Sequence, residues 1–224
     1  LALRRTALGI IRTLIENKKN LRINDLLTSS SLSYESQGFN LENKDLQKEL
    51  QNFLKDRFRY YLKEKEIRYD IIEATLSSFS LNKLFSSFEK AECLNKVINN
   101  QIGKSITSSY KRALNIFDAE MRNKKTQIDD STDPGIFKND FEKNLYKKIN
   151  EIEKYYSNIN NDEDYNKSLF ILADSQKEIF EFFDNVKVND ESEILRKNRL
   201  ELINIFCKTL EDFIDFQMIK KINE

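Results

Sequence analysis

The sequence predicts an all-α protein, a multi-helix bundle, and three observations lead to this prediction. Only four Gly and one Pro occur in 224 residues, too few for the tight turns of a multi-stranded protein. Apolar residues recur at three- and four-residue steps along most of the chain, as in amphipathic helices. The content of 39% apolar and 33% charged residues is typical of a folded, soluble protein with a sizeable core.

We expect two helical halves, residues 1–121 and 137–224, joined by a linker over 122–136. In the first half, apolar spacing predicts a helix over 1–15 and a long amphipathic helix over 41–66, with shorter helices at about 69–78, 81–99 and 102–120. The Ser-rich run 28–31 and Gly38 predict a loop between the first two helices. The first helix starts without a Met or a capping residue, so we expect a truncated N-terminus, cut from a longer chain.

The linker contains the clearest break in the chain, Asp133-Pro134-Gly135, preceded by further Asp residues. Beyond it, apolar stripes predict three helices, over 137–156, over 165–183, and from about Asp190 to the end of the chain. Helices of this length joined by short connections should pack as a bundle. We expect Asn189 or Asp190 to cap the last helix, with Glu193 in a loose capping-box relation to Asp190.

The composition excludes several classes of function. The chain has no His, which removes His-based acid–base catalysis and most transition-metal sites. Cys93 and Cys207 lie far apart without CxxC spacing, and no Gly-rich phosphate loop is present. We therefore expect no catalytic centre, metal site or cofactor in this chain. No run approaches about 18 apolar residues and no signal peptide is evident, so we expect a cytoplasmic protein without a membrane partner.

The charges are unevenly distributed although the net charge is zero. Residues 1–22 hold six basic groups and one acidic group, and residues 100–125 hold six basic and two acidic groups. Residues 151–193 hold twelve acidic and four basic groups. Basic stretches of this kind are typical of nucleic-acid-binding surfaces, although such runs also occur on ordinary solvated helix faces.

Four segments, in order, resemble the β subunit of bacterial glycyl-tRNA synthetase. They are LALRRTALGIIR from Leu1, NFLKDRFRYYLKEKEIRYDIIEATL from Asn52, YKRALNI from Tyr110 and FFDNVKVNDESEILRKNRLELI from Phe182. The last segment resembles the motif that names the DALR-type anticodon-binding domain, with Glu193-Ile194 in place of Asp-Ala. The family commonly has Met at the position of Lys187. Arginyl-tRNA synthetases resemble the last three predicted helices but lack the second segment.

The resemblance implies an anticodon-binding region without a catalytic centre, which supports aminoacylation of tRNA(Gly) in a glycine–tRNA ligase. It also implies a partner, the α subunit of a heterotetramer, which activates glycine with ATP and Mg²⁺. Two alternatives stay open. One is the equivalent domain of an arginine–tRNA ligase, and the other is a helical module that binds protein through the apolar stripe of residues 41–66.

Proteins read anticodon loops by stacking planar side chains on unpaired bases and by hydrogen bonds to base edges, while Lys and Arg hold the phosphates. Asp184, Asn185 and Asn189 could accept from the cytosine N4 amine, and glycine anticodons end in two cytosines. The other candidate tRNA-binding residues, for backbone contact or stacking, are Lys111, Arg112, Asn115, Arg196, Arg199, Arg4, Arg5, Arg57 and Arg59. Alternatively, Asp184 or Asp190 pairs with Arg196 or Arg199 and only fixes the loop.

Overall fold

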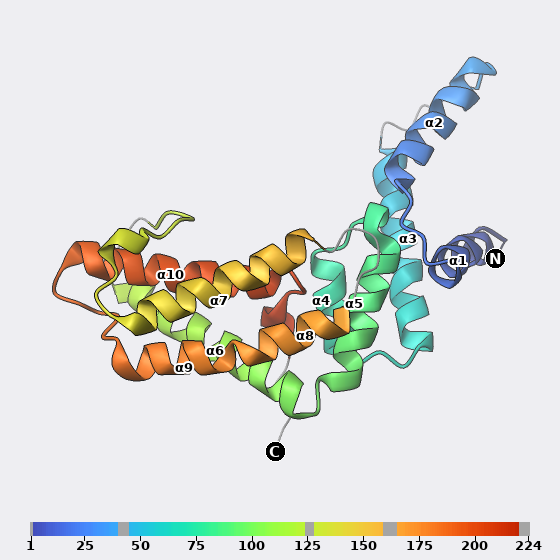
Figure 1. The fold of residues 1–224 in the computed structure, drawn as a ribbon. Helices are drawn as coiled ribbons and strands as arrows, with labels where there is room; N and C mark the ends of the chain where they lie inside the picture. Colours follow the sequence, from blue (N-terminus) through green and yellow to red (C-terminus); the bar gives the residue numbers. More distant parts are fainter. Residues whose placement is uncertain (1, 40–44, 124–127, 159–164, 220–224) are drawn as a thin grey trace. The chain divides into compact units, whose positions relative to one another are not determined.

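The computed structural model describes residues 2–39, 45–123, 128–158 and 165–219. Within these ranges every regular element is a helix, which confirms the all-α prediction (Figure 1). No helix in these parts of the chain is both long and apolar enough to cross a bilayer. The chain divides into two compact units, Leu1–Asn95 and Lys96–Glu224.

The division between the units lies at residue 95, whereas the sequence places the linker at 122–136. The difference arises from α6 (Gln101–Asn123), which is part of the second unit. It packs against α8 (Tyr165–Asp174), α9 (Gln176–Asn185) and α10 (Glu193–Glu211). Of the predicted linker, residues 124–127 lie outside the described residues.

The first unit is built around α3 (Leu46–Glu64), which packs against α1 (Ala2–Glu16) and α4 (Tyr69–Ser77). The short η1 (Leu81–Lys83) and then α5 (Leu84–Val97) follow. The apolar stripe of α3 is core, since Phe58 and Leu62 are fully buried and Phe58 stacks on Phe79 with ring centroids 5.1 Å apart. The second half of that stripe is therefore not free to pair with another protein, whereas Leu46, Leu50 and Phe53 in its first half are half-buried.

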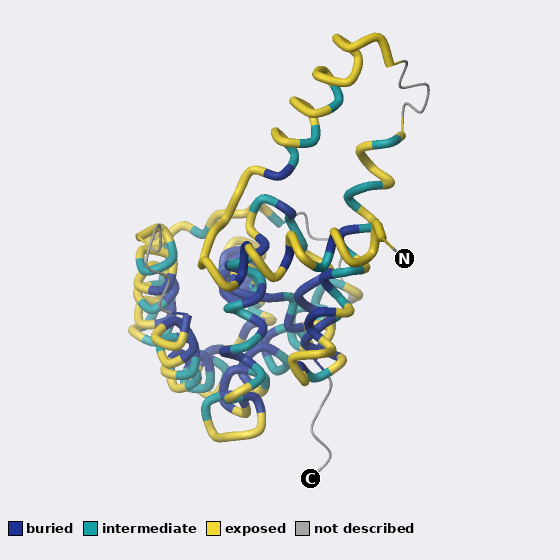
Figure 2. Tube along the Cα trace, turned by 90° about the vertical axis from the view of Figure 1, so that its right-hand side faces the viewer, coloured by how far each residue is buried: buried dark blue, intermediate teal, exposed yellow. Residues whose placement is uncertain are grey.

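The prediction of a loop around the Ser-rich run 28–31 is wrong, because these residues lie in α2 (Ile23–Ser36). Their hydroxyls bond within the helix, as when Thr28 donates to the carbonyl of Asn24 at 3.0 Å, so they need no loop geometry. The start of α2 is also tied to α3, because Gln51 donates to the side chain of Asn24 at 3.0 Å. Most of α2 is exposed (Figure 2).

In the second unit, α7 (Asp140–Ser157) packs against α8, α9 and α10, and α6 packs against the same three helices. Between α6 and α7 the chain forms the short η2 (Pro134–Ile136). The facing apolar stripes form one core, in which Leu145, Ile149, Phe182, Ile203 and Phe206 have no exposed surface. The predicted bundle is present, with α6 as an additional member.

The single helix predicted over 165–183 is broken at Ser175 into α8 and α9. The buried Ser175 hydroxyl donates to the carbonyl of Leu172 at 2.6 Å, and its backbone N–H bonds to the same carbonyl at 3.3 Å. These local bonds replace the regular ladder of the helix at this point. The apolar spacing continues across the break, which explains why the sequence predicts one helix.

The last helix, α10, starts and ends differently from the prediction. Its cap is Ser192, whose side chain accepts from the N–H of Leu195, and not Asn189 or Asp190. It ends at Glu211, after which Phe213 and Phe216, both nearly fully buried, turn the chain back toward the core. The short η3 (Phe216–Met218) places the ring of Phe216 5.8 Å from that of Tyr110. This local burial ends the helix before the terminus.

Candidate nucleic-acid interface

The segment 186–192 connects α9 to α10, and buried side chains hold it in place. Val186 and Val188 are buried, whereas Lys187 and Asn189 between and after them are exposed. The backbone is extended at Val186, where successive side chains point to opposite faces, and it bends at Val188 and Asn189, where the N–H of Asp190 bonds to the carbonyl of Val188 at 2.9 Å. The bundle thus anchors the segment with two Val residues and presents Lys187 and Asn189 to solvent.

Arg199 braces the same segment from the first half of α10. Its Nη1 donates to the carbonyl of Lys187 at 2.9 Å and to Oδ2 of Asp190 at 2.8 Å. The N–H of Ser192 and the Arg199 guanidinium both favour the carboxylate form of Asp190 and so lower its pKa. The alternative that Asp190 pairs with Arg199 to fix the loop is therefore confirmed.

The Nε side of the Arg199 guanidinium is bound by the buried carboxylate of Glu142. Arg199 Nε donates to Oε1 of Glu142 at 2.7 Å, and only 5% of Arg199 and 1% of Glu142 is exposed. Glu142 lies at the third position of α7, in a capping box with Asn139, and its Oε2 accepts from the backbone N–H groups of Lys138 and Asn139. Arg199 is thus committed to the scaffold and has almost no surface left for a phosphate.

Arg112 on α6 and Asp184 on α9, both candidate residues from the sequence, form an ion pair with a separation of 2.6 Å. The Arg112 guanidinium also lies over two rings of α9, 4.8 Å from the centroid of Phe180 and 5.3 Å from that of Phe183. The Arg112 side chain is 35% exposed, whereas Arg199 is buried. Sequence reasoning missed Phe180 and Phe183 as site residues, although their spacing on α9 places both beside Asp184.

The other candidates of the second unit differ in accessibility. Asn115 is exposed on α6, and Lys111 on the same helix is half-buried. Asn185 is exposed at the end of α9, where its amide donates to the carbonyl of Glu181 at 2.8 Å. Arg196 is buried, 3.6 Å from the carboxylate of Glu193, and its Nε has no hydrogen-bond partner among the described residues.

In the first unit, Arg4 and Arg5 are exposed on α1. Arg59 bonds to both carboxylate oxygens of Glu73 at 3.1 and 3.3 Å and thereby ties α3 to α4. Arg57 is half-buried, with its guanidinium 5.6 Å from the ring of Phe53. Accessible basic groups of this unit are thus found on α1, while Arg57 and Arg59 lie in internal contacts.

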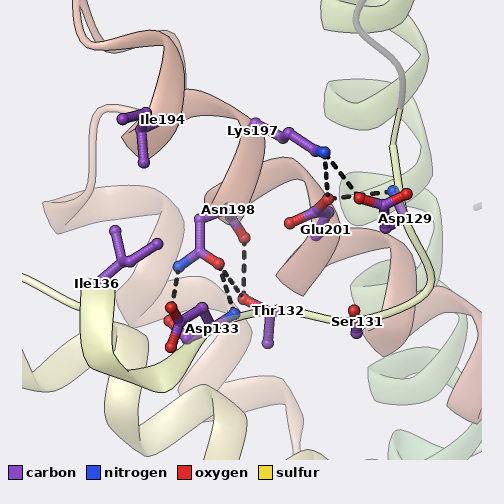
Figure 3. A pocket seen from close by; sticks show the side chains of 9 residues that line it. All are labelled: Asp129, Ser131, Thr132, Asp133, Ile136, Ile194, Lys197, Asn198 and Glu201. Carbon is purple, nitrogen blue, oxygen red and sulfur yellow. Dashed lines mark hydrogen bonds and ion pairs between the residues drawn. The ribbon is translucent and has the colours of Figure 1, made fainter.

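An open pocket of about 310 Å³ lies between residues 129–136 and the start of α10 (Figure 3). Asn198 spans its floor, accepting from the N–H of Asp133 at 2.7 Å and donating to the Asp133 carbonyl at 3.1 Å. Lys197 pairs with Asp129 at 2.7 Å. The lining holds more acidic than basic side chains, so the pocket is unsuited to binding phosphate. Its polar groups bond to one another and thereby hold residues 129–136 against α10.

Among the residues that the structure describes, no three or more His, Cys, Asp or Glu side chains come together in a group that could hold a metal ion. The buried Cys207 has its pKa raised to about 12 by burial, with the carboxylates of Glu211 and Asp118 adding to the shift, so it is a thiol at neutral pH.

Comparisons with known proteins agree with this architecture. Residues 106–223 match the family model described as the DALR anticodon binding domain, and this range holds most of α6, all of α7–α10 and the 186–192 segment. The chain belongs to the family of DALR anticodon-binding domains. Residues 1–77 match the model described as the glycyl-tRNA synthetase beta subunit.

Among proteins with a DALR anticodon-binding domain, this chain is similar to glycine–tRNA ligase beta subunits. The chain is 35% identical over 217 residues to the glycine–tRNA ligase beta subunit of Rickettsia felis, covering 96% of the chain and 30% of that protein. It is 34% identical over 220 residues to the same subunit of Rickettsia africae, again covering 30% of the relative. The resemblance to the glycyl-tRNA synthetase β subunit is therefore confirmed, and the chain spans about 30% of the length of these relatives.

Proposed function

We propose that this chain is the anticodon-binding region of a glycine–tRNA ligase β subunit, and that it binds tRNA(Gly) through a surface on its second unit. This surface, the loop face, consists of Lys111, Arg112, Asn115, Asp184, Asn185, Lys187 and Asn189. The observation that carries the proposal is the bracing of segment 186–192 by Arg199, which holds exposed polar side chains in a fixed geometry. A site held in place before binding loses less conformational entropy when the ligand arrives.

The roles on the loop face follow from side-chain chemistry. Asp184, Asn185 and Asn189 present acceptors for the N4 amine of cytosine, the group that separates cytosine from uracil. Lys111, Arg112 and Lys187 supply positive charge for the phosphates that flank the bases. Arg199 positions the segment through its bonds to Lys187 and Asp190, and the buried Arg196 belongs to the scaffold at the start of α10.

The first unit contributes phosphate contacts through the exposed Arg4 and Arg5 of α1. Contacts of this type position RNA but carry no sequence information. Arg57 and Arg59 support the unit from within, because Arg59 is bound to Glu73 and Arg57 is packed on Phe53. The first unit is thus proposed to add affinity, and the second to add specificity.

The whole enzyme requires more than this chain. The relatives are named as beta subunits, which supports a partner α subunit, in a heterotetramer. In this proposal the α subunit binds ATP and Mg²⁺ and activates glycine, and the β subunit delivers tRNA(Gly) to it in the cytoplasm. The match of residues 1–77 to the glycyl β-subunit model favours this assignment over the arginine–tRNA ligase alternative.

The test measures the affinity of the αβ holoenzyme for a tRNA(Gly) transcript, and for the same transcript with both anticodon cytosines replaced by uracil. Affinity should fall with salt for both transcripts because binding releases counterions. At every salt concentration the changed anticodon should bind more weakly, by about 5-fold or more for each lost base contact. Equal binding of the two transcripts would contradict base reading. Failure of both to bind would favour the interaction-module alternative.

A further inference from the structure

The contacts around Arg112 suggest a role more specific than phosphate binding. Its guanidinium lies over Phe180 and Phe183, while Asp184 holds one edge at 2.6 Å. Both rings are half-buried and come from α9, which packs against α6 (Figure 1). Arg112 is therefore held between an apolar support and a carboxylate, and keeps 35% of its side chain exposed.

This arrangement suits stacking better than it suits capture of a phosphate. Guanidinium is planar and stacks on aromatic faces, whereas its edge carries the N–H donors. Asp184 already occupies one donor of the Arg112 edge, Nη2, and partly neutralises its charge, which weakens attraction for a phosphate. Arginine planes and aromatic rings are the surfaces on which proteins stack unpaired bases.

Asp184 provides base specificity beside the Arg112 guanidinium. Its Oδ1 accepts from Arg112, whereas no hydrogen bond to its Oδ2 is formed by the described residues. Of the Asp184 side chain, 63% is exposed. A carboxylate oxygen accepts from the N4 amine of cytosine and repels the O4 carbonyl oxygen of uracil. The free oxygen beside the stacking plane thus favours cytosine over uracil.

We propose that Arg112, supported by Phe180 and Phe183, is a stacking platform for one cytosine of the anticodon loop, and that Asp184 selects this base through Oδ2. This inference rests on the proposed function, since it assigns a place to a base that the loop face reads. Arg112 is then a contact residue for the base, and Phe180 and Phe183 are positioning residues. Lys187 and Asn189 remain for the neighbouring nucleotides.

The experiment is a coupling measurement with the αβ holoenzyme and tRNA(Gly) transcripts. Wild type and Arg112→Lys are each titrated with the normal transcript, and with transcripts abasic at one or other of the last two anticodon positions. Lys keeps the charge but removes the plane. For the normal transcript, Arg112→Lys should weaken binding by about 5- to 150-fold, the range measured for stacking of one base. For the transcript that lacks the stacked base, the same substitution should change affinity less than about 2-fold.

Two further variants complete the test. Arg122→Lys changes an exposed Arg on the same helix, outside the loop face, and should leave all affinities unchanged. Asp184→Asn should reduce the preference for cytosine over uracil at the stacked position, because an amide can also donate to the O4 carbonyl. Thermal unfolding of each β variant checks that the fold is retained.

The outcomes distinguish the stacking platform at Arg112 from the proposed function, binding of the tRNA(Gly) anticodon. Anticodon changes that weaken binding, combined with equal losses from Arg112→Lys on normal and abasic transcripts, would overturn the platform and leave the proposed function intact. Insensitivity of the wild-type enzyme to every anticodon change would instead overturn both. The platform would be supported if Arg112→Lys weakened binding of the normal transcript but not of one abasic transcript, and if Asp184→Asn lowered the preference for cytosine.

Discussion

Arg199 and Arg112 form the same kind of pair, an arginine with a carboxylate of another helix, in opposite surroundings. Arg199 is 5% exposed and bonds to Glu142, Asp190 and a backbone carbonyl. Arg112 has a single paired carboxylate, Asp184, and 35% of its side chain is exposed. The difference teaches that burial, and not the residue type, separates an arginine that builds the site from one that can meet the ligand.

The largest effect is expected for Arg199→Ala. This change leaves Glu142 buried without its cation and should lower the free energy of unfolding by about 3–5 kcal/mol, as for broken buried pairs. Urea denaturation followed by circular dichroism measures the loss. The double variant Arg199→Leu, Glu142→Gln should recover part of it, because no unpaired charge then stays buried and the amide oxygen can still accept from the N–H groups of Lys138 and Asn139. A loss below about 1 kcal/mol would show that Arg199 does not brace the fold.

A medium effect is expected for Asn198→Ala, which tests whether a neutral buried side chain braces the unit as Arg199 does. Asn198 is 3% exposed and bonds to both the N–H and the carbonyl of Asp133. Its removal should cost about 1–3 kcal/mol, since a backbone donor is left without a partner. Asn204→Ala is the matched control, because within the described part of the chain the side chain of Asn204 donates only to Asp130, at 3.4 Å on the surface. Equal losses in the two variants would contradict this account.

A smaller effect on stability is expected for Arg112→Ala. An exposed ion pair and a cation–π contact contribute about 1 kcal/mol together, because water screens both. The same urea experiment should therefore show a loss several times smaller than that of Arg199→Ala, while tRNA affinity falls. A stability loss comparable to that of Arg199→Ala would remove the distinction between the two arginines.

The smallest effect is a pH dependence that originates at Asp190. Its pKa is lowered in the folded state by the Ser192 N–H and by Arg199, so its contribution to stability is present above the unfolded pKa of about 3.9. The contribution is lost as the pH falls through the lower folded pKa. The stability difference between wild type and Asp190→Asn should therefore shrink below about pH 4. A difference that is constant between pH 6 and pH 2 would contradict the pairing.

Local sequence patterns predicted the helices well where apolar spacing was strong, as in α3, α6 and α7. They failed where side-chain hydroxyls decided the backbone, at the Ser-rich α2 and at Ser175. The cap of α10 was also missed, because Asp190 is held by Arg199 and leaves Ser192 as the cap. In each case local polar contacts accompany the difference, and apolar periodicity does not report such contacts.

The candidate site was predicted in part. The sequence brought attention to Asp184, Arg112 and Arg199, and left open that an Asp of this region only fixes the loop. It could not show that Arg199 faces Glu142, which lies 57 positions away in the chain. One signal was available, since the Asn139–Glu142 spacing of a capping box marks that carboxylate as one held at a helix start. Phe180 and Phe183 were not predicted as site residues, because aromatic residues on a helix serve stacking and core packing alike.

The alternation of buried Val186 and Val188 with exposed Lys187 and Asn189 has a consequence for evolution. Substitutions at the two exposed positions alter what the segment offers to a ligand while the anchoring positions stay filled. Insertion or deletion of one residue, by contrast, would displace the valines from their buried positions. We expect relatives that recognise other anticodons to carry different residues at these two exposed positions, in a segment of the same length.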